Sequence, residues 1–211
     1  MSNNAEIVKQ AVSDAITQLT MQGSGNRAGK LTAWGTAMLA KLRRAVGKAP
    51  GESADVWEIT IGALPKELQG YDDKPNFAEL AVHTALTLFG LHQQGRIESV
   101  SENGASFGKA VRYIIISDGI KEEGVRRRFN ALATAESFTE LSHHARSLVQ
   151  LMKSVKPKPA CFDYPQFAVD LYYYQFGSEI RNNVRMGWGR DFYSFKKENI
   201  ENINEEENDD E

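Results

Sequence analysis

Apolar residues recur every three or four positions along most of the chain, which is the spacing of amphipathic helices. Glycine or proline interrupts this pattern after each segment, as expected where helices end. In the first half, the pattern predicts helices over residues 4–22, 31–45, 53–65 and 75–95. The stretch 95–104 is polar and rich in glycine, so we take it as the boundary between two helical subdomains.

Helix starts are marked clearly in the second half. Ser106 can cap a helix, Ser137 forms a capping box with Glu140, and Asp163 precedes a Tyr-Pro start. The second half is predicted to hold helices over residues 106–117, 121–135, 137–152, 163–177 and 181–195. No hairpin pattern occurs, so we expect an all-α, elongated fold of about nine helices. The predicted units are an N-terminal bundle (1–100), a C-terminal bundle (101–197) and an acidic disordered tail (198–211).

The last predicted helix carries both arginines and aromatic residues. Arg181 and Arg185 lie four positions apart and share a face, next to an apolar stripe that includes Trp188. We expect Trp188 and Phe192 to anchor the segment and the two arginines to be its exposed charges. An ordinary amphipathic helix with a solvated outer face explains the same pattern.

Charge is distributed unevenly along the chain. The net charge is −3, but residues 198–211 hold eight acidic residues and no basic one. Residues 103–197 hold 15 Lys or Arg against 9 Asp or Glu. A basic body suits an anionic partner, and an acidic tail could suppress its nonspecific binding.

The sequence lacks the usual marks of membrane insertion and redox chemistry. No apolar run is long enough to span a bilayer, and the N-terminus has no secretory signal, so we expect a cytoplasmic protein without membrane contact. Cys161 is the single cysteine, which excludes an internal disulfide. His83 and His92 lie nine positions apart on one predicted helix, half a turn out of phase, and cannot ligate one metal from it.

Catalytic motifs are missing as well. Neither a Walker loop nor a dinucleotide fingerprint is present. Four carboxylates, Asp163, Asp170, Glu179 and Asp191, are dispersed at spacings that caps and salt bridges explain equally well. We therefore expect no catalytic residue, no metal site and no cofactor, although sequence spacing does not reveal a site that is assembled in space.

Several motifs in series resemble the CasB family, the small subunits of the type I-E CRISPR Cascade complex. The resemblance rests on Ser106–Ala110 (SFGKA), Val125–Leu132 (VRRRFNAL), Tyr164 through Leu171, and Trp188–Tyr193 (WGRDFY). Looser matches at Leu39–Ala45 and Ala78–Leu86 extend it to roughly residues 28–195. Each motif is short, and their order and spacing give the resemblance its specificity.

The resemblance implies a non-catalytic, all-helical protein that pairs with a second copy of itself. It would contact the backbone and large subunits of Cascade and, through phosphates, the crRNA and the target DNA. Base pairing with the guide supplies sequence specificity, so such a subunit needs only phosphate contacts and stacking to hold the strands of the R-loop. Carried over by position, the nucleic-acid-binding residues would be Arg43, Arg44, Lys109, Arg112, Arg126, Arg127, Arg185 and Arg190.

Some assignments remain open at the level of sequence. Arg190 could instead pair with Asp191 or Asp170 and lock the last helix, and Arg128 flanks the predicted core, where we favour packing. Two other functions fit the same residues: a helical adaptor that binds acidic protein partners without nucleic acid, and a nuclease with a spatially assembled acidic site.

Overall fold

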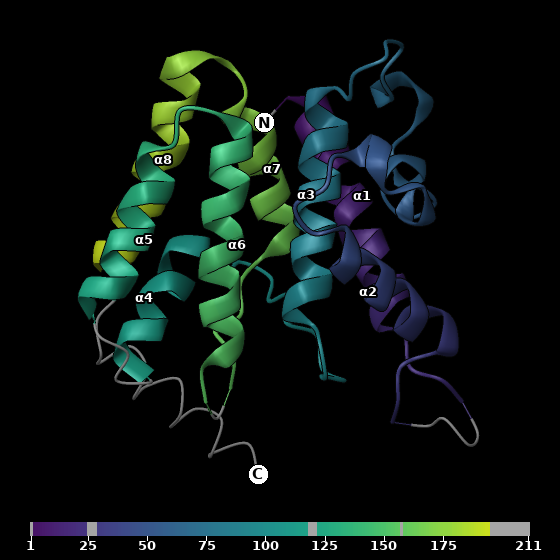
Figure 1. Cartoon of the computed structure of the whole chain (residues 1–211), viewed down its shortest axis with the longest axis horizontal. Coiled ribbons are helices and arrows are strands. Elements are labelled where there is room, and N and C mark those ends of the chain that lie inside the picture. Colours follow the sequence, from purple (N-terminus) through teal and green to yellow (C-terminus); the bar gives the residue numbers. More distant parts are fainter. Residues whose placement is uncertain (1, 25–28, 118–121, 157, 195–211) are drawn as a thin grey trace.

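The structure is a computed structural model, and it describes residues 2–24, 29–117, 122–156 and 158–194 (Figure 1). The α-helices of the first half are α1 (Asn3–Thr20), α2 (Ala33–Ala45) and α3 (Phe77–His92). Those of the second half are α4 (Phe107–Ser117), α5 (Glu122–Thr134), α6 (Phe138–Ser154), α7 (Tyr164–Tyr174) and α8 (Gly177–Ser194). Within these ranges β-structure is limited to two isolated bridges, so the all-α prediction is confirmed. The predicted acidic tail lies outside the described residues.

The segment between α2 and α3 differs from the prediction of one short helix over 53–65. It consists of 3-10 turns: η2 (Pro50–Glu52), η3 (Ala54–Val56), η4 (Ile61–Ala63) and η5 (Lys66–Leu68). Gly62 lowers the helix propensity of this segment, and Pro65 favours an extended backbone at Leu64, which is observed. The indole of Trp57 instead donates to the Pro50 carbonyl at 2.6 Å and holds the first turns together.

The predicted N-caps are confirmed. Ser106 accepts from the Lys109 N–H at 3.2 Å, Ser137 from the Glu140 N–H at 3.1 Å, and Asp163 from the Gln166 N–H at 2.8 Å. The capping box at Ser137 is only half formed, because the Glu140 carboxylate accepts from the N–H of residue 136 instead.

The sequence analysis missed a complete capping box at the start of α3. The Asn76 side chain accepts from the Glu79 N–H at 2.9 Å, and the Glu79 carboxylate accepts from the Asn76 N–H at 2.8 Å. This reciprocal pair fixes where α3 begins, two residues later than the proline from which the prediction started.

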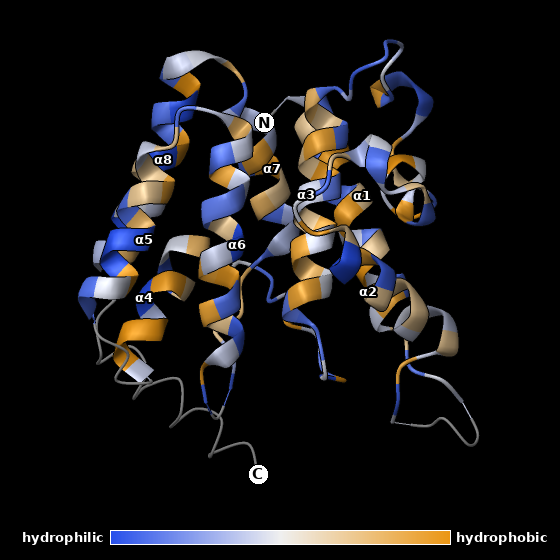
Figure 2. Ribbon diagram, in the orientation of Figure 1, coloured by the Kyte–Doolittle hydropathy of each residue, from blue (hydrophilic) through white to orange (hydrophobic). Residues whose placement is uncertain are grey.

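Helix α3 packs against α1, α2, α6 and α7, and it is apolar over most of its surface (Figures 1 and 2). Helix α7 packs against α1 and α3 from the first half and against α8 from the second. Buried residues form one continuous cluster through both halves. Because this core does not separate residues 1–100 from residues 101–197, the division into these two units stays a prediction.

Aromatic rings connect the two halves. Phe89 of α3 meets Tyr164 edge-on at 5.3 Å, and His92 of α3 stacks on Phe162 at 6.0 Å, measured between ring centroids. The buried Tyr164 hydroxyl donates to the Leu88 carbonyl of α3 at 3.3 Å. Aromatic pairs add about 1 kcal/mol each beyond the area that they bury, so this cluster fixes α7 against α3.

Candidate nucleic-acid interface

Helix α8 is anchored by the two aromatic residues that the sequence predicted. Trp188 is 3 % exposed and Phe192 is fully buried. The Phe192 ring stacks on Phe129 of α5 at 4.5 Å, and the Trp188 indole donates to the Asp170 carboxylate at 2.7 Å. The backbone of Trp188 also passes so close to Gly108 that a methyl group there would meet its carbonyl oxygen. Helix α8 is thus fixed against α4, α5 and α7.

The expectation that Arg181 and Arg185 are exposed charges is wrong. The Arg181 side chain is 21 % exposed and the Arg185 side chain 18 %. Both form ion pairs with Glu136, at 3.4 and 3.3 Å, and Arg185 also donates to the Tyr174 hydroxyl at 3.1 Å and to the carbonyl of residue 135. Both guanidinium groups lie over the Tyr174 ring. Their interactions join α8 to the α5–α6 connection, a contact that the helical spacing of α8 alone does not show.

Arg112 and Arg126 are brought together by a carboxylate. Arg112 of α4 contacts the Glu122 carboxylate at 2.9 Å, and Arg126 of α5 contacts the same oxygen atom. The hydrogen bond from Arg126, followed by that from Arg112, lowers the pKa of Glu122. Each arginine also lies near an aromatic ring of the last helix, Arg112 over Phe192 and Arg126 over Tyr193. Part of the charge of this pair is therefore neutralised within the chain.

Three of the predicted residues are exposed cations without such neutralisation. Lys109, Arg127 and Arg190 form no ion pair or side-chain hydrogen bond with any other described residue. The alternative pairing of Arg190 with Asp191 or Asp170 is accordingly not formed. Because α4 packs against both α5 and α8, these three cations belong to one group of helices.

The other predicted residues lie elsewhere or serve packing. Arg43 and Arg44 are on α2, which belongs to the first half, so the structure does not bring them together with the α4–α5–α8 cations. Arg44 is 63 % exposed and lies 3.9 Å from Asp55, a weak surface ion pair. Arg128 donates to the Gly124 carbonyl at 3.0 Å on its own helix, and the packing role favoured for it stays a prediction.

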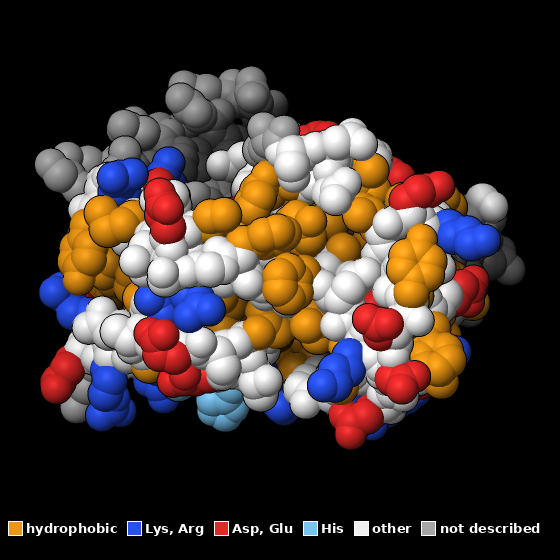
Figure 3. All heavy atoms as spheres, turned by 90° about the horizontal axis from the view of Figure 1, so that it is seen from above, with side chains coloured by type: hydrophobic (Ala, Val, Ile, Leu, Met, Phe, Trp, Pro, Cys, Tyr) orange, Lys and Arg blue, Asp and Glu red, His pale blue; other side chains and the backbone are white. Residues whose placement is uncertain are grey.

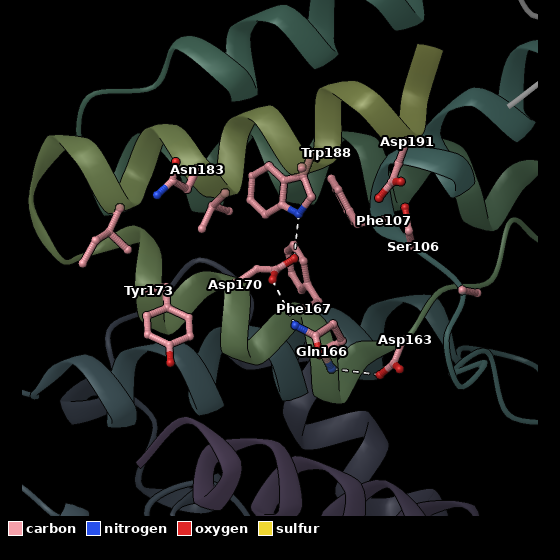
Figure 4. A pocket seen from close by; sticks show the side chains of 14 residues that line it. Ser106, Phe107, Asp163, Gln166, Phe167, Asp170, Tyr173, Asn183, Trp188 and Asp191 are labelled. Atoms are coloured by element: carbon pink, nitrogen blue, oxygen red, sulfur yellow. Dashed lines mark hydrogen bonds between the residues drawn. The ribbon is translucent and has the colours of Figure 1, made fainter. Parts of the chain in front are cut away.

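Three of the dispersed carboxylates line one pocket of about 540 Å³ between α7 and α8 (Figure 4). They are Asp163, Asp170 and Asp191, and no Lys, Arg or His belongs to the described lining. Burial raises the pKa of Asp170 to about 6, against the hydrogen bonds from Trp188 and Gln166 and with a further rise from the other two carboxylates. A site of this charge disfavours phosphate.

The same carboxylates do not make a metal centre. No group of three or more His, Cys, Asp or Glu side chains in the described ranges is arranged to hold a metal ion. Asp163 uses both carboxylate oxygens on backbone N–H groups, those of Gly104 and Gln166. Sequence spacing did not predict the pocket, because its residues come from separate elements.

The cysteine and a buried histidine are not poised for chemistry near neutral pH. Burial raises the pKa of the Cys161 thiol to about 11, which keeps it protonated. Burial, together with the charges of Arg96 and Lys153, lowers the pKa of His92 to about 3, so its ring is neutral. Its Nδ1 atom lies 3.2 Å from the Tyr164 hydroxyl.

One face of the molecule is apolar at its centre. Seen from above Figure 1, apolar side chains gather in the middle of this face and charged ones lie around them (Figure 3). The N-terminal end of α3 and the α7–α8 turn lie at this upper end, where Phe77 is 43 % exposed and Ile180 40 %. The Phe77 ring meets Phe176 edge-on at 5.2 Å. An exposed cluster of this kind is typical of a protein contact. No helix among the described residues has the length and apolar content needed to cross a membrane.

Comparison with known proteins gives matches over most of the chain. A family model described as CRISPR-associated protein Cse2 matches residues 38–193. The crystal structure of CasB from Thermobifida fusca is 27% identical, with a TM-score of 0.64 over 90% of this chain and 97% of that one. A Cse2-family CRISPR-associated protein from Thermus thermophilus is 20% identical, with a TM-score of 0.63 over 92% of this chain and 100% of that one, and shows the same fold. A search of curated protein sequences found no match.

Proposed function

Because the chain belongs to the Cse2 (CasB) family of CRISPR-associated proteins, we propose that it is the non-catalytic small subunit of a type I-E Cascade complex. In this role it works in the cytoplasm and uses basic residues to hold the target and displaced DNA strands of the R-loop during antiviral defence. The family match over residues 38–193 carries the proposal. Exposed cations that have no acidic partner among the described residues, such as Arg127 and Arg190, support it.

Chemistry limits what such a subunit has to do. The guide RNA pairs with the target strand, so the protein needs affinity for phosphates and no base-specific contacts. Arginine suits this task because its planar guanidinium can bond two phosphate oxygens at once. The apolar face around Phe77 and Ile180 is suited to contact with a second copy of the chain or with the backbone and large subunits.

Charge reversal in the assembled complex tests the proposal. The variant carries Glu at Arg43, Arg44, Arg126 and Arg127, and the lifetime of the R-loop is measured over a range of salt concentrations. We expect target DNA to dissociate at least about tenfold faster, with a salt slope reduced by roughly three, because binding through fewer phosphate contacts releases fewer counterions. Circular dichroism checks that the fold is retained.

A matched control reverses two exposed lysines outside the predicted site, Lys66 and Lys74, and should leave the R-loop lifetime unchanged. An unchanged lifetime in the four-arginine variant would contradict the proposal. The alternative of a helical adaptor for acidic protein partners predicts that those partners co-purify after nuclease treatment while the chain retains no DNA. A nuclease would instead show metal-dependent cleavage by the purified chain.

A further inference from the structure

Helices α2 and α6 flank α3 (Figure 1), and three cations lie on or next to these three helices. They are Arg43 on α2, Arg96 just after α3, and Lys153 near the end of α6. The Lys153 ammonium group donates to the side-chain oxygen of Gln94. Burial, and then the charges of Arg43 and Arg96, lowers the pKa of Lys153. The three residues are therefore near enough for their charges to interact, and we call them the seam cations.

The seam cations differ from ordinary surface lysines in two respects. All three are half-buried, so they are less well solvated than exposed cations. None forms an ion pair with another described residue, and the carboxylates of Glu98 and Glu102 on the adjoining loop are not paired with them. Partly desolvated like charges repel each other, and an anion bound among them would relieve this repulsion.

The basic surface continues along α6 from Lys153. Arg146 lies seven positions earlier, two turns away, so it projects from the same face at a distance of about 10 Å along the axis. Its guanidinium group lies over Gly47 at the end of α2, 3.2 Å from the position that a methyl group would take there.

Arg146 and Lys48 both line a groove of about 420 Å³ between the end of α2, α3 and α6. The Glu52 carboxylate in the described lining is already engaged, because it accepts the N–H of Ala49 at 2.9 Å. The groove and the seam cations thus form a basic strip along the contact between the first and second halves of the chain.

We propose that the seam cations, extended by Lys48 and Arg146, bind consecutive phosphodiester groups of a single nucleic-acid strand and contribute more to strand affinity than the arginines of α5 and α8. The inference rests on the function proposed above and assigns its main contact to a different surface. On α5, Arg126 is already paired with Glu122, and on α8, Arg185 is already paired with Glu136. Arg127 and Arg190 are unpaired among the described residues but exposed, so water solvates them better than it solvates the half-buried seam cations. At about 3.4 Å per charge along a stacked strand, the separation of Arg146 and Lys153 corresponds to roughly three nucleotides.

Two variants of the full chain, each with three cations replaced, test whether the seam cations contribute more to strand affinity than the arginines of α5 and α8. One variant replaces Arg43, Arg96 and Lys153 with Gln, and the other replaces Arg126, Arg127 and Arg190 with Gln. Binding of a fluorescein-labelled oligothymidylate is measured by anisotropy over a range of salt concentrations. We expect the first variant to lose at least about tenfold in affinity, with the salt slope smaller by about two, and the second to lose less than about threefold.

The outcomes separate this inference from the proposed function. If the unaltered chain does not bind the oligonucleotide, the proposed function fails. If the unaltered chain binds and the seam variant binds equally well, or the second triple variant loses more affinity, the inference is overturned while the proposed function stands. Thermal melting of both variants shows whether an affinity loss reflects unfolding.

A second readout follows Lys153 directly in the unaltered chain. Its pKa is measured by NMR of the side-chain ε-carbon, with and without the same unlabelled oligothymidylate. Burial and the two neighbouring arginines hold this pKa below its ordinary value, and a bound phosphodiester should raise it, because an anion favours the charged form. A pKa that does not change at a saturating strand concentration would overturn the assignment of Lys153 to the site.

Discussion

The hydrogen bond between Trp188 and Asp170 should contribute an amount of stability that depends on pH. The indole Nε1 donates to the Asp170 carboxylate at 2.7 Å, and this bond lowers a pKa that burial has raised to about 6. Trp188→Phe keeps most of the buried ring and removes the donor. A hydrogen bond to a charged group is worth about 2–3 kcal/mol and one to a neutral group about 1 kcal/mol.

The direction in which this contribution changes with pH follows from the protonation state of Asp170. Above a pKa of about 6 the carboxylate is ionised, and losing its donor leaves a poorly solvated charge. Below it, a proton replaces the missing partner. Trp188→Phe should therefore cost about 3 kcal/mol of unfolding free energy near pH 8 and about 1–2 kcal/mol near pH 5, including the lost packing.

Urea unfolding followed by far-ultraviolet circular dichroism measures both values, since the substitution removes a fluorophore. The control is the same substitution in an Asp170→Asn background, where position 170 is no longer ionisable and the cost of Trp188→Phe should not change with pH. An equal cost at the two pH values in the original background, or a pH dependence that persists in the Asp170→Asn background, would refute the reasoning.

Three further predictions concern packing, pairing and acid stability. Gly108→Ala should destabilise the protein by about 3 kcal/mol in a thermal or urea melt, because the added methyl group would overlap the Trp188 carbonyl oxygen of α8. The control Gly187→Ala adds its methyl group in open space and should be neutral or stabilising by up to about 1 kcal/mol. Equal effects of the two substitutions would contradict the contact between Gly108 and Trp188. Arg185→Gln should lower the unfolding free energy by about 2 kcal/mol and change oligothymidylate affinity less than about twofold; the opposite pattern would assign Arg185 to phosphate. The buried His92 has a pKa of about 3. As the pH falls below the ordinary pKa of histidine, the unfolded state therefore binds a proton at this residue and the native state does not. His92→Gln should therefore lose about 2 kcal/mol less stability than the unaltered chain between about pH 7 and pH 5, as measured by urea midpoints, and equal losses would show that His92 is protonated in the fold.

The sequence determined the local structure and the family. Helical periodicity predicted the all-α class, and the caps at Ser106, Ser137 and Asp163 predicted where three helices begin. The apolar stripe of the last helix identified Trp188 and Phe192 as anchors. The resemblance to CasB is confirmed by the Cse2 match. These features depend on residues a few positions apart, whose geometry is set by 3.6 residues per turn.

The tertiary structure alone decided which charges are available. Arg185 had an exposed position on the helical wheel, yet Glu136, forty-nine residues earlier, meets it across the α5–α6 connection. Helix packing also places Arg43 near Lys153, and it places Asp170 and Asp191 in the lining of one pocket. Side-chain pairing between distant segments depends on how helices cross, and helix periodicity contains no information about that crossing. The short segment between Ser53 and Pro65 was mispredicted for a related reason, since its turns are held by a bond to Pro50, outside the apolar pattern.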